Sequence, residues 1–111
     1  MTVKTKKPIT DYIEATIEDL KGDEEAQIAY LQASFEENYD MPAAILLAIR
    51  MVAKARGFKN FAEEADLNRE NLYKSLSDGG NPILDTFFKL LDALKLKLTV
   101  TPIVPLKKKA S

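Results

Sequence analysis

The spacing of apolar residues along the chain predicts a series of short helices. Through most of the sequence, apolar side chains recur every three or four residues, which is the period of a helix with one buried face. The helices predicted on this basis cover about residues 10–20, 23–39, 43–56, 60–65, 69–76 and 84–94. We therefore expect an all-α fold, a bundle of five to six helices.

The predicted helix over 43–56 differs from the others because it is apolar on most sides. A helix that is apolar all round is buried all round, so this segment should be the central helix. Pro42 suits its first turn, and Gly57 suits its C-terminal cap. The apolar side chains that place it in the core are Ile45, Leu46, Leu47, Ile49, Met51 and Val52.

After the last predicted helix the apolar period changes from between three and four to two. Leu96, Leu98 and Val100 alternate with polar residues, a pattern that predicts one short strand, which Pro102 would end. A strand does not stand alone, and the pattern shows no second one. The segment is expected either to pair with its copy in a second subunit or to pack as an extended tail.

The two ends of the chain look different from its middle. The whole chain has 111 residues, the usual size of one domain. Residues 1–9 are polar and basic, and residues 102–111 include Lys107, Lys108 and Lys109. We expect a disordered N-terminus, a single helical domain over 10–101 and a flexible basic tail. No apolar run approaches the roughly 20 residues that span a bilayer, and no signal peptide is visible, so a cytoplasmic protein without membrane contact is expected.

Two residue types that carry much of protein chemistry are missing from the chain. It has no Cys and no His, which excludes disulfides, thiolate or imidazole metal ligands and the commonest general base. Glu63 and Glu64 are paired carboxylates, but adjacent helical residues do not point at one spot. We expect no enzyme, no metal, no cofactor and no small-molecule substrate.

The charge of the chain is unevenly distributed, although the total is only −1. Residues 1–40 carry four Lys and ten acidic residues, a net charge of −6. Residues 41–111 carry twelve Lys and Arg and seven acidic residues, a net charge of +5. This division predicts two surfaces with different partners. The alternative is chance variation among solvated faces.

The stretch over residues 58–77, FKNFAEEADLNRENLYKSLS, predicts two helices joined by a tight turn. Asp66 lies in the turn, where the backbone is left-handed and Gly is usual; Asp tolerates that conformation better than most residues. Asn68 is a good N-cap for the second helix. Asn60 and Glu63 could cap the first helix as a capping box.

The second of these helices carries a polar outer face. Leu72 and Leu76 turn inward, which leaves Arg, Asn, Tyr and Lys side chains outside. Arg can bond guanine and Asn adenine, while Lys and Tyr can hold phosphates. The candidate DNA-binding residues are Lys59, Asn60, Asn68, Arg69, Glu70, Asn71, Tyr73, Lys74 and Ser77. The alternative is a plain helical hairpin with a polar face.

Residues 62–77, AEEADLNRENLYKSLS, resemble the phage-repressor (XRE) type of helix-turn-helix. More closely, the chain is similar to the HigA-like addiction module antidotes, the antitoxins of toxin–antitoxin operons, over about residues 10–101. The likeness extends to Gly80-Asn81-Pro82 and to the stretches 23–31 and 91–100. Asp66 and Lys95 depart from it where Gly is usual, as does Lys59 where Thr or Ser often caps the first helix.

This resemblance implies a sequence-specific DNA-binding antitoxin. Such a protein neutralises a small basic toxin, typically a RelE/ParE-like ribonuclease, and represses its own operon by binding operator DNA as a homodimer. The acidic residues among 11–40 could meet the toxin and the basic half the DNA. The alternatives are a stand-alone helix-turn-helix repressor and a protein-interaction inhibitor with little DNA binding.

Overall fold

The computed structural model describes residues 9–104, and in this range the chain is all-helical. The all-α prediction is confirmed. Most of the observed helices begin and end within two residues of the predicted bounds. They are α1 (Ile9–Leu20), α2 (Glu24–Glu37), α3 (Pro42–Arg56), α4 (Phe58–Glu64), α5 (Arg69–Leu76) and α6 (Leu84–Ala93).

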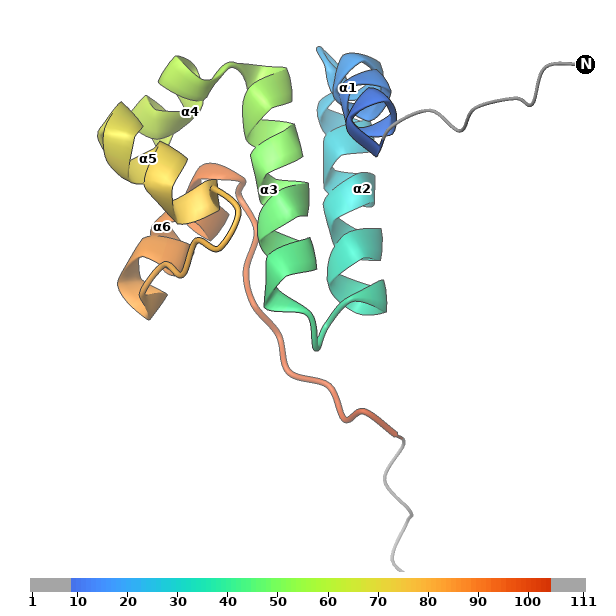
Figure 1. Ribbon diagram of the computed structural model, residues 1–111. Helices are drawn as coiled ribbons and strands as arrows, with labels where there is room; N and C mark the ends of the chain where they lie inside the picture. The colour runs from blue at the N-terminus through green and yellow to red at the C-terminus, as the bar shows by residue number, and fades with distance from the viewer. Residues whose placement is uncertain (1–8, 105–111) are drawn as a thin grey trace, which may run out of the picture.

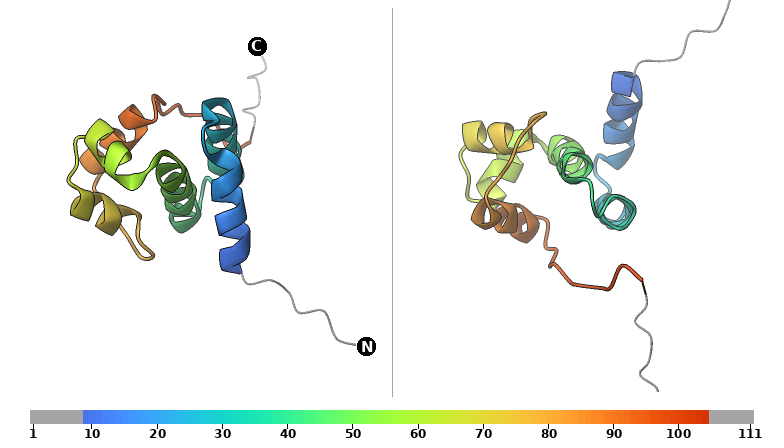
Figure 2. Two further views of the ribbon diagram at one scale, coloured as in Figure 1. Left: turned by 90° about the horizontal axis from the view of Figure 1, so that it is seen from above. Right: turned by 60° about the horizontal axis from the view of Figure 1, so that its bottom comes forward.

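Helix α3 lies at the centre of the bundle, as predicted. It separates α1 and α2 on one side from α4, α5 and α6 on the other (Figure 1), an arrangement that also appears from above (Figure 2). Ile49, Val52 and Ala53 on α3 have no exposed surface. They join one continuous core with Leu31 of α2, Phe61 of α4, Leu72 and Leu76 of α5, and Leu90 and Leu94 of α6.

A single glycine joins α3 to α4. Gly57 is the C-cap of α3 and the N-cap of α4, with φ of 94°. Its positive φ, which few other residues tolerate, turns the chain straight from one helix into the next. The prediction that Asn60 caps the following helix is therefore wrong, because that helix already begins at Phe58 and Asn60 lies inside it.

The predicted strand over 96–100 does not form. After α6, Lys95 takes a left-handed conformation with φ of 61°, and the N–H of Leu96 donates to the carbonyl of Leu91 at 2.9 Å. This closes the helix in a Schellman motif. Residues 96–104 then run on from the end of α6 with no regular structure (Figure 1). Local alternation predicted a strand, but residues 9–104 offer no second strand to complete a ladder.

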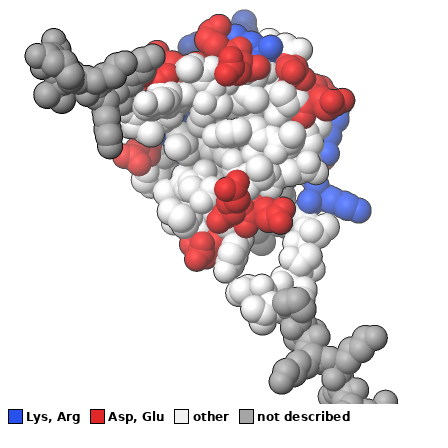
Figure 3. Space-filling model, turned by 90° about the vertical axis from the view of Figure 1, so that its right-hand side faces the viewer, with Lys and Arg blue, Asp and Glu red and all other residues white. Residues whose placement is uncertain are grey.

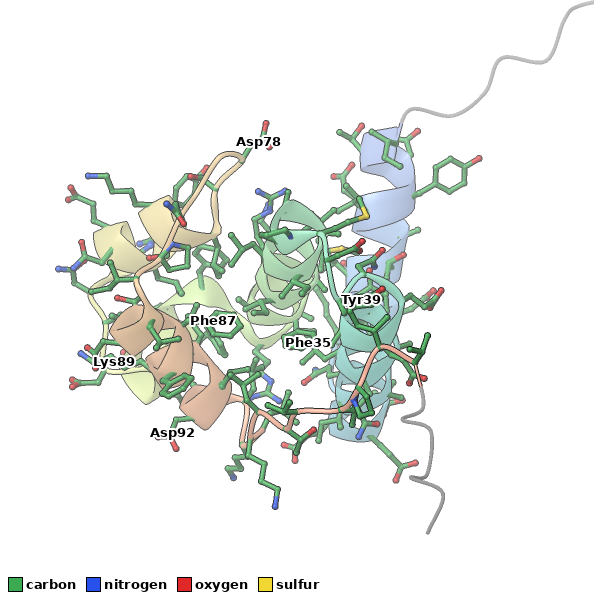
Figure 4. All side chains as sticks on the ribbon, turned by 90° about the horizontal axis from the view of Figure 1, so that it is seen from below. Phe35, Tyr39, Asp78, Phe87, Lys89 and Asp92 are labelled. Carbon is green, nitrogen blue, oxygen red and sulfur yellow. The ribbon has the colours of Figure 1, made fainter. Side chains whose placement is uncertain are left out.

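Two contacts connect the helices on opposite sides of α3. Phe35 of α2 and Phe87 of α6 point toward each other (Figure 4), with ring centroids 6.5 Å apart. Gln27, the one buried polar residue among those described, donates to the Leu20 carbonyl at 2.8 Å and accepts from Arg56 Nε at 2.8 Å. Arg56 in turn donates to the Ala93 carbonyl at 3.4 Å. One polar network thus joins the ends of α1 and α6 to side chains of α2 and α3.

The predicted disordered N-terminus and basic tail lie mostly outside the residues that the structure describes. Ile9, predicted to be disordered, begins α1. The rest of the expected disordered N-terminus, and the part of the expected basic tail from residue 105 onward, lie outside the described residues. Among the helices of residues 9–104, none has the length and apolar character needed to cross a bilayer.

Candidate nucleic-acid interface

The turn between α4 and α5 has the geometry expected from its sequence. Asp66 takes a left-handed conformation with φ of 56°. Its N–H donates to the Glu63 carbonyl at 3.2 Å, and the Leu67 N–H donates to the Ala62 carbonyl at 2.9 Å. These two bonds form a second Schellman motif, with Asp where Gly is usual. Ala62 and Ala65 are buried, and their small side chains let the two helices approach closely.

Helix α5 has the bounds, the cap and the inner face that its sequence predicts. The Asn68 side chain accepts a hydrogen bond from the Asn71 N–H at 2.6 Å, which confirms Asn68 as the N-cap. Leu72 and Leu76 are buried against the core. One side of α5 therefore packs against the core, and the opposite side is exposed to solvent.

The outer side of α5 presents a row of polar side chains. Arg69, Glu70, Asn71, Tyr73 and Lys74 are all exposed. The Tyr73 ring meets Phe58 of α4 edge-on, with centroids 5.8 Å apart, yet remains 65% exposed. This contact orients the ring and leaves most of its surface free. The structure thus leaves five of the nine predicted residues exposed on α5.

The other four predicted residues have different surroundings. Asn68 uses its side-chain oxygen in the cap. The Ser77 hydroxyl donates to the Lys74 carbonyl at 2.9 Å, and Ser77 is half-buried. Lys59 is exposed in the first turn of α4. Asn60, which is also exposed, lines a groove together with Gly22 and Glu24 at the α1–α2 turn.

One residue that holds α5 in place was missed by the sequence reasoning. Arg50 of α3 donates from Nη1 to the carbonyl of Leu76, the last residue of α5, at 3.0 Å. A positive guanidinium at this end complements the negative end of the helix dipole. The available signal was that Arg50 is the one charged residue between Pro42 and Lys54, on an otherwise apolar helix.

The loop after α5 passes very close to that helix. A Cβ added to Gly80 would stand 2.4 Å from the Ser75 carbonyl oxygen and 2.9 Å from that of Lys74. The Gly80 N–H donates to the Ser77 carbonyl at 2.8 Å. Gly80 therefore allows an approach that any side chain would obstruct, and the loop closes over the C-terminal end of α5.

The side of the molecule opposite α5 is strongly acidic. We define the acidic face as the surface of α1, α2 and the turns that follow them, within residues 9–40. This range holds one Lys and ten acidic residues, a net charge of −9. Acidic side chains lie mainly around the margins and in the lower part of this face, its middle is mostly uncharged, and few basic side chains are visible there (Figure 3). Tyr12 and Tyr39 are also exposed in this range.

Comparison with known proteins identifies the family. A family model described as "Probable addiction module antidote protein" matches residues 9–102, nearly all of the described chain. The chain belongs to this family. It is also 37% identical over 83 residues to an uncharacterized protein of Haemophilus influenzae strain Rd, covering 75% of this chain and 82% of that protein. No solved structure gives a significant match.

Membership in the antidote family confirms the coarser part of the resemblance. An antidote of an addiction module is an antitoxin, which implies a toxin as its partner and a regulatory role for the protein. The match begins at the first residue of α1 and ends in the extended segment, so it includes both the acidic face and the α4–α5 pair.

Proposed function

We propose that this antidote protein is a DNA-binding antitoxin that represses its own operon. In this proposal α4 and α5 form a helix-turn-helix, α5 enters the major groove of the operator, and two copies bind as a homodimer. The acidic face on the other side of α3 binds and neutralises a small basic toxin of the RelE/ParE-like kind. The two partners would occupy opposite sides of the bundle and could be held at the same time.

The observation that carries the DNA-binding proposal is the outer face of α5. Its polar side chains are exposed, while Asn68 and Arg50 hold the two ends of the helix. In a major groove, Arg69 would donate to guanine, Asn71 would pair with adenine and Glu70 would accept from cytosine. Tyr73, Lys74 and Lys59 would contact phosphates. Half-sites about one helical turn apart, roughly 34 Å, would fit a two-fold pair.

The toxin-binding part of the proposal rests on the family and on the charge of the acidic face. A net charge of −9 over residues 9–40 would attract a basic protein and accelerate its encounter. Exposed tyrosines such as Tyr12 are of a type enriched at protein interfaces and could supply apolar contact within the charged surface. The negative charge also disfavours DNA on this side.

The first experiment is binding of the purified chain to DNA from just upstream of its own gene. Fluorescence anisotropy at two salt concentrations would be compared with a scrambled duplex of equal composition. We expect tight binding to the natural duplex, weaker binding to the scrambled one, and a loss of affinity as salt rises. Equal, weak binding to both duplexes would reject operator recognition by the free protein.

A second candidate function is toxin inhibition with little DNA binding. It is favoured by the charge of residues 9–104, where ten Lys and Arg stand against seventeen acidic residues, a net charge of −7. Strong DNA binders usually carry a basic surface. Co-purification with the product of a neighbouring reading frame, without retention of the upstream duplex, would select this function. A gene with no such neighbour would instead favour a stand-alone repressor.

A further inference from the structure

Helix α6 is apolar on two sides, and only one of them is covered. Leu90, Leu91, Ala93 and Leu94 are buried. On the outer side, Leu84 is 66% exposed and Phe88 50% exposed, and Ile83 before the helix is also exposed. Leu84 and Phe88 are four residues apart and therefore lie on one helical face. An exposed apolar cluster of this kind typically marks an interaction surface.

The extended segment over residues 96–104 continues this apolar surface. Phe88 and Leu91 of α6 line a shallow groove together with Leu96 and Leu98. Val100 is 98% exposed. No backbone hydrogen bond joins residues 97–104 to another part of the described chain. The segment therefore presents both apolar side chains and open backbone donors and acceptors, which is the condition in which a strand edge pairs with another chain.

The charges around the groove indicate which partner fits it. Two acidic residues, Asp85 and Asp92, and two basic ones, Lys89 and Lys97, line it. Lys89 and Asp92 point away from the bundle, on the side of α6 opposite Phe87 (Figure 4). A surface with equal numbers of both signs suits neither DNA nor a strongly basic toxin. A second copy suits it, because an isologous contact lets the acidic groups of one copy pair with the basic groups of the other.

We propose that the outer side of α6 and the extended segment together form the interface between two copies of this chain. The inference rests on the proposed homodimer and names its surface. The segments 96–100 of the two copies pair as antiparallel strands centred on Leu98. α6 of each copy packs its Leu84 and Phe88 against the same surface of the other.

The sequence of the extended segment favours this register. With Leu98 opposite its own copy, Leu96 lies opposite Val100 and Lys97 opposite Thr99. Every apolar residue meets an apolar residue, and every Lys meets a Thr. A shift of the centre to residue 97 would set two Lys side chains directly opposite each other, which is unfavourable. The exposed row on α5 is not part of this surface, so it remains available to DNA.

Sedimentation equilibrium of the full chain without DNA tests the interface. The wild type is expected to dimerise, and Leu98→Lys and Phe88→Glu each to weaken the dimer by about tenfold or more, since each buries an unpaired charge at the interface. Met41→Lys, at a 53% exposed position just before α3, is the matched control and should leave dimerisation unchanged. Wild type that remains monomeric at all concentrations, or variants that dimerise like it, would overturn the proposal.

Cysteine cross-linking tests the register, because the chain has no cysteine of its own. Residues directly opposite on paired strands have Cβ atoms about 4.5–5.5 Å apart, whereas diagonal neighbours are about 7–8 Å apart. A mixture of Lys97→Cys and Thr99→Cys chains should therefore form a mixed disulfide faster than either chain alone. Faster cross-linking of Lys97→Cys with itself would overturn the register. Both experiments omit DNA, so their failure leaves operator binding to be decided by anisotropy.

Discussion

The two sides of the molecule, separated by α3, organise their polar side chains in different ways. On the α5 side, an eight-residue helix is capped at its start by Asn68, held at its end by Arg50 and approached closely by the loop at Gly80. On the α1–α2 side, longer helices gather a net charge of −9 over residues 9–40. Base recognition requires strict hydrogen-bond geometry, whereas attraction of a basic protein requires mainly net charge. The ordered α5 side therefore suits the proposed DNA partner, and the charged α1–α2 side suits the proposed basic toxin.

The largest expected difference between the sides concerns the core beneath α5. Leu72→Ala should destabilise the fold by about 2–5 kcal/mol, because Leu72 has no exposed surface and its removal leaves a cavity. Tyr12→Ala, at an exposed position on α1, should change stability by less than about 0.5 kcal/mol. Urea denaturation followed by circular dichroism measures both. Equal losses for the two variants would contradict the assigned core.

Two substitutions on α5 separate base recognition from phosphate contact. Arg69→Ala should cost about 1–3 kcal/mol of operator affinity and reduce the preference over scrambled DNA. Lys74→Ala should weaken binding to both duplexes alike and lower the salt slope by about one. Lys21→Ala, which removes the same charge after α1, is the control and should affect neither duplex. Binding by Arg69→Ala that matches wild type would remove Arg69 from the recognition surface.

Alanine substitutions at Gly80 and Gly22 compare the loop after α5 with the turn between α1 and α2. Gly80→Ala should cost about 1–3 kcal/mol of stability, since its Cβ would lie 2.4 Å from the Ser75 carbonyl oxygen. Gly22→Ala meets nothing within 4 Å, and its cost should be about 1 kcal/mol, from the left-handed φ of 72° alone. Thermal unfolding of both variants tests the ranking. A larger loss at Gly22 would show that the α1–α2 turn is the more constrained one.

The smallest effect is expected from the ion pair on the acidic side. Lys21, just after α1, pairs with Glu18 in its last turn, and their side chains are 52% and 68% exposed. Because an exposed pair is screened by solvent, Glu18→Gln should change stability by at most about 0.5 kcal/mol. The same denaturation experiment in low and high salt provides the measurement. A loss above about 1 kcal/mol would mean that charge on this side contributes to the fold as well as to partner attraction.

Features determined by neighbouring residues could be predicted from the sequence. The bounds of α5, the Asn68 cap and the left-handed Asp66 follow from periodicity and local backbone chemistry. Features that depend on distant segments could not. Arg50 binds a backbone carbonyl 26 residues away, and a carbonyl carries no sequence signal. The sequence predicted Gly57 only as the C-cap of α3 and Asn60 as the cap of the next helix, whereas Gly57 caps both helices because α4 begins directly after it.

The predicted strand over 96–100 also failed because it depends on a second segment. Alternation at Leu96, Leu98 and Val100 is a property of one segment, whereas a ladder requires two. In the proposed dimer the same alternating segment would form a strand paired with its copy, and the cross-linking experiment tests this pairing. The DNA contacts of the nine candidate residues stay predictions. The structure adds that Asn60 lines a groove beside the α1–α2 turn and that the Ser77 hydroxyl is already hydrogen-bonded to the Lys74 carbonyl.

Arg50 and Arg56 are six residues apart on α3, about 9 Å along its axis. Each donates to a carbonyl at or near the end of a different helix, Arg50 to Leu76 of α5 and Arg56 to Ala93 of α6. The ends of both helices are thereby ordered before any partner arrives. If α5 enters a groove as proposed, less conformational entropy remains to be lost, so a larger share of each contact's free energy would appear as affinity.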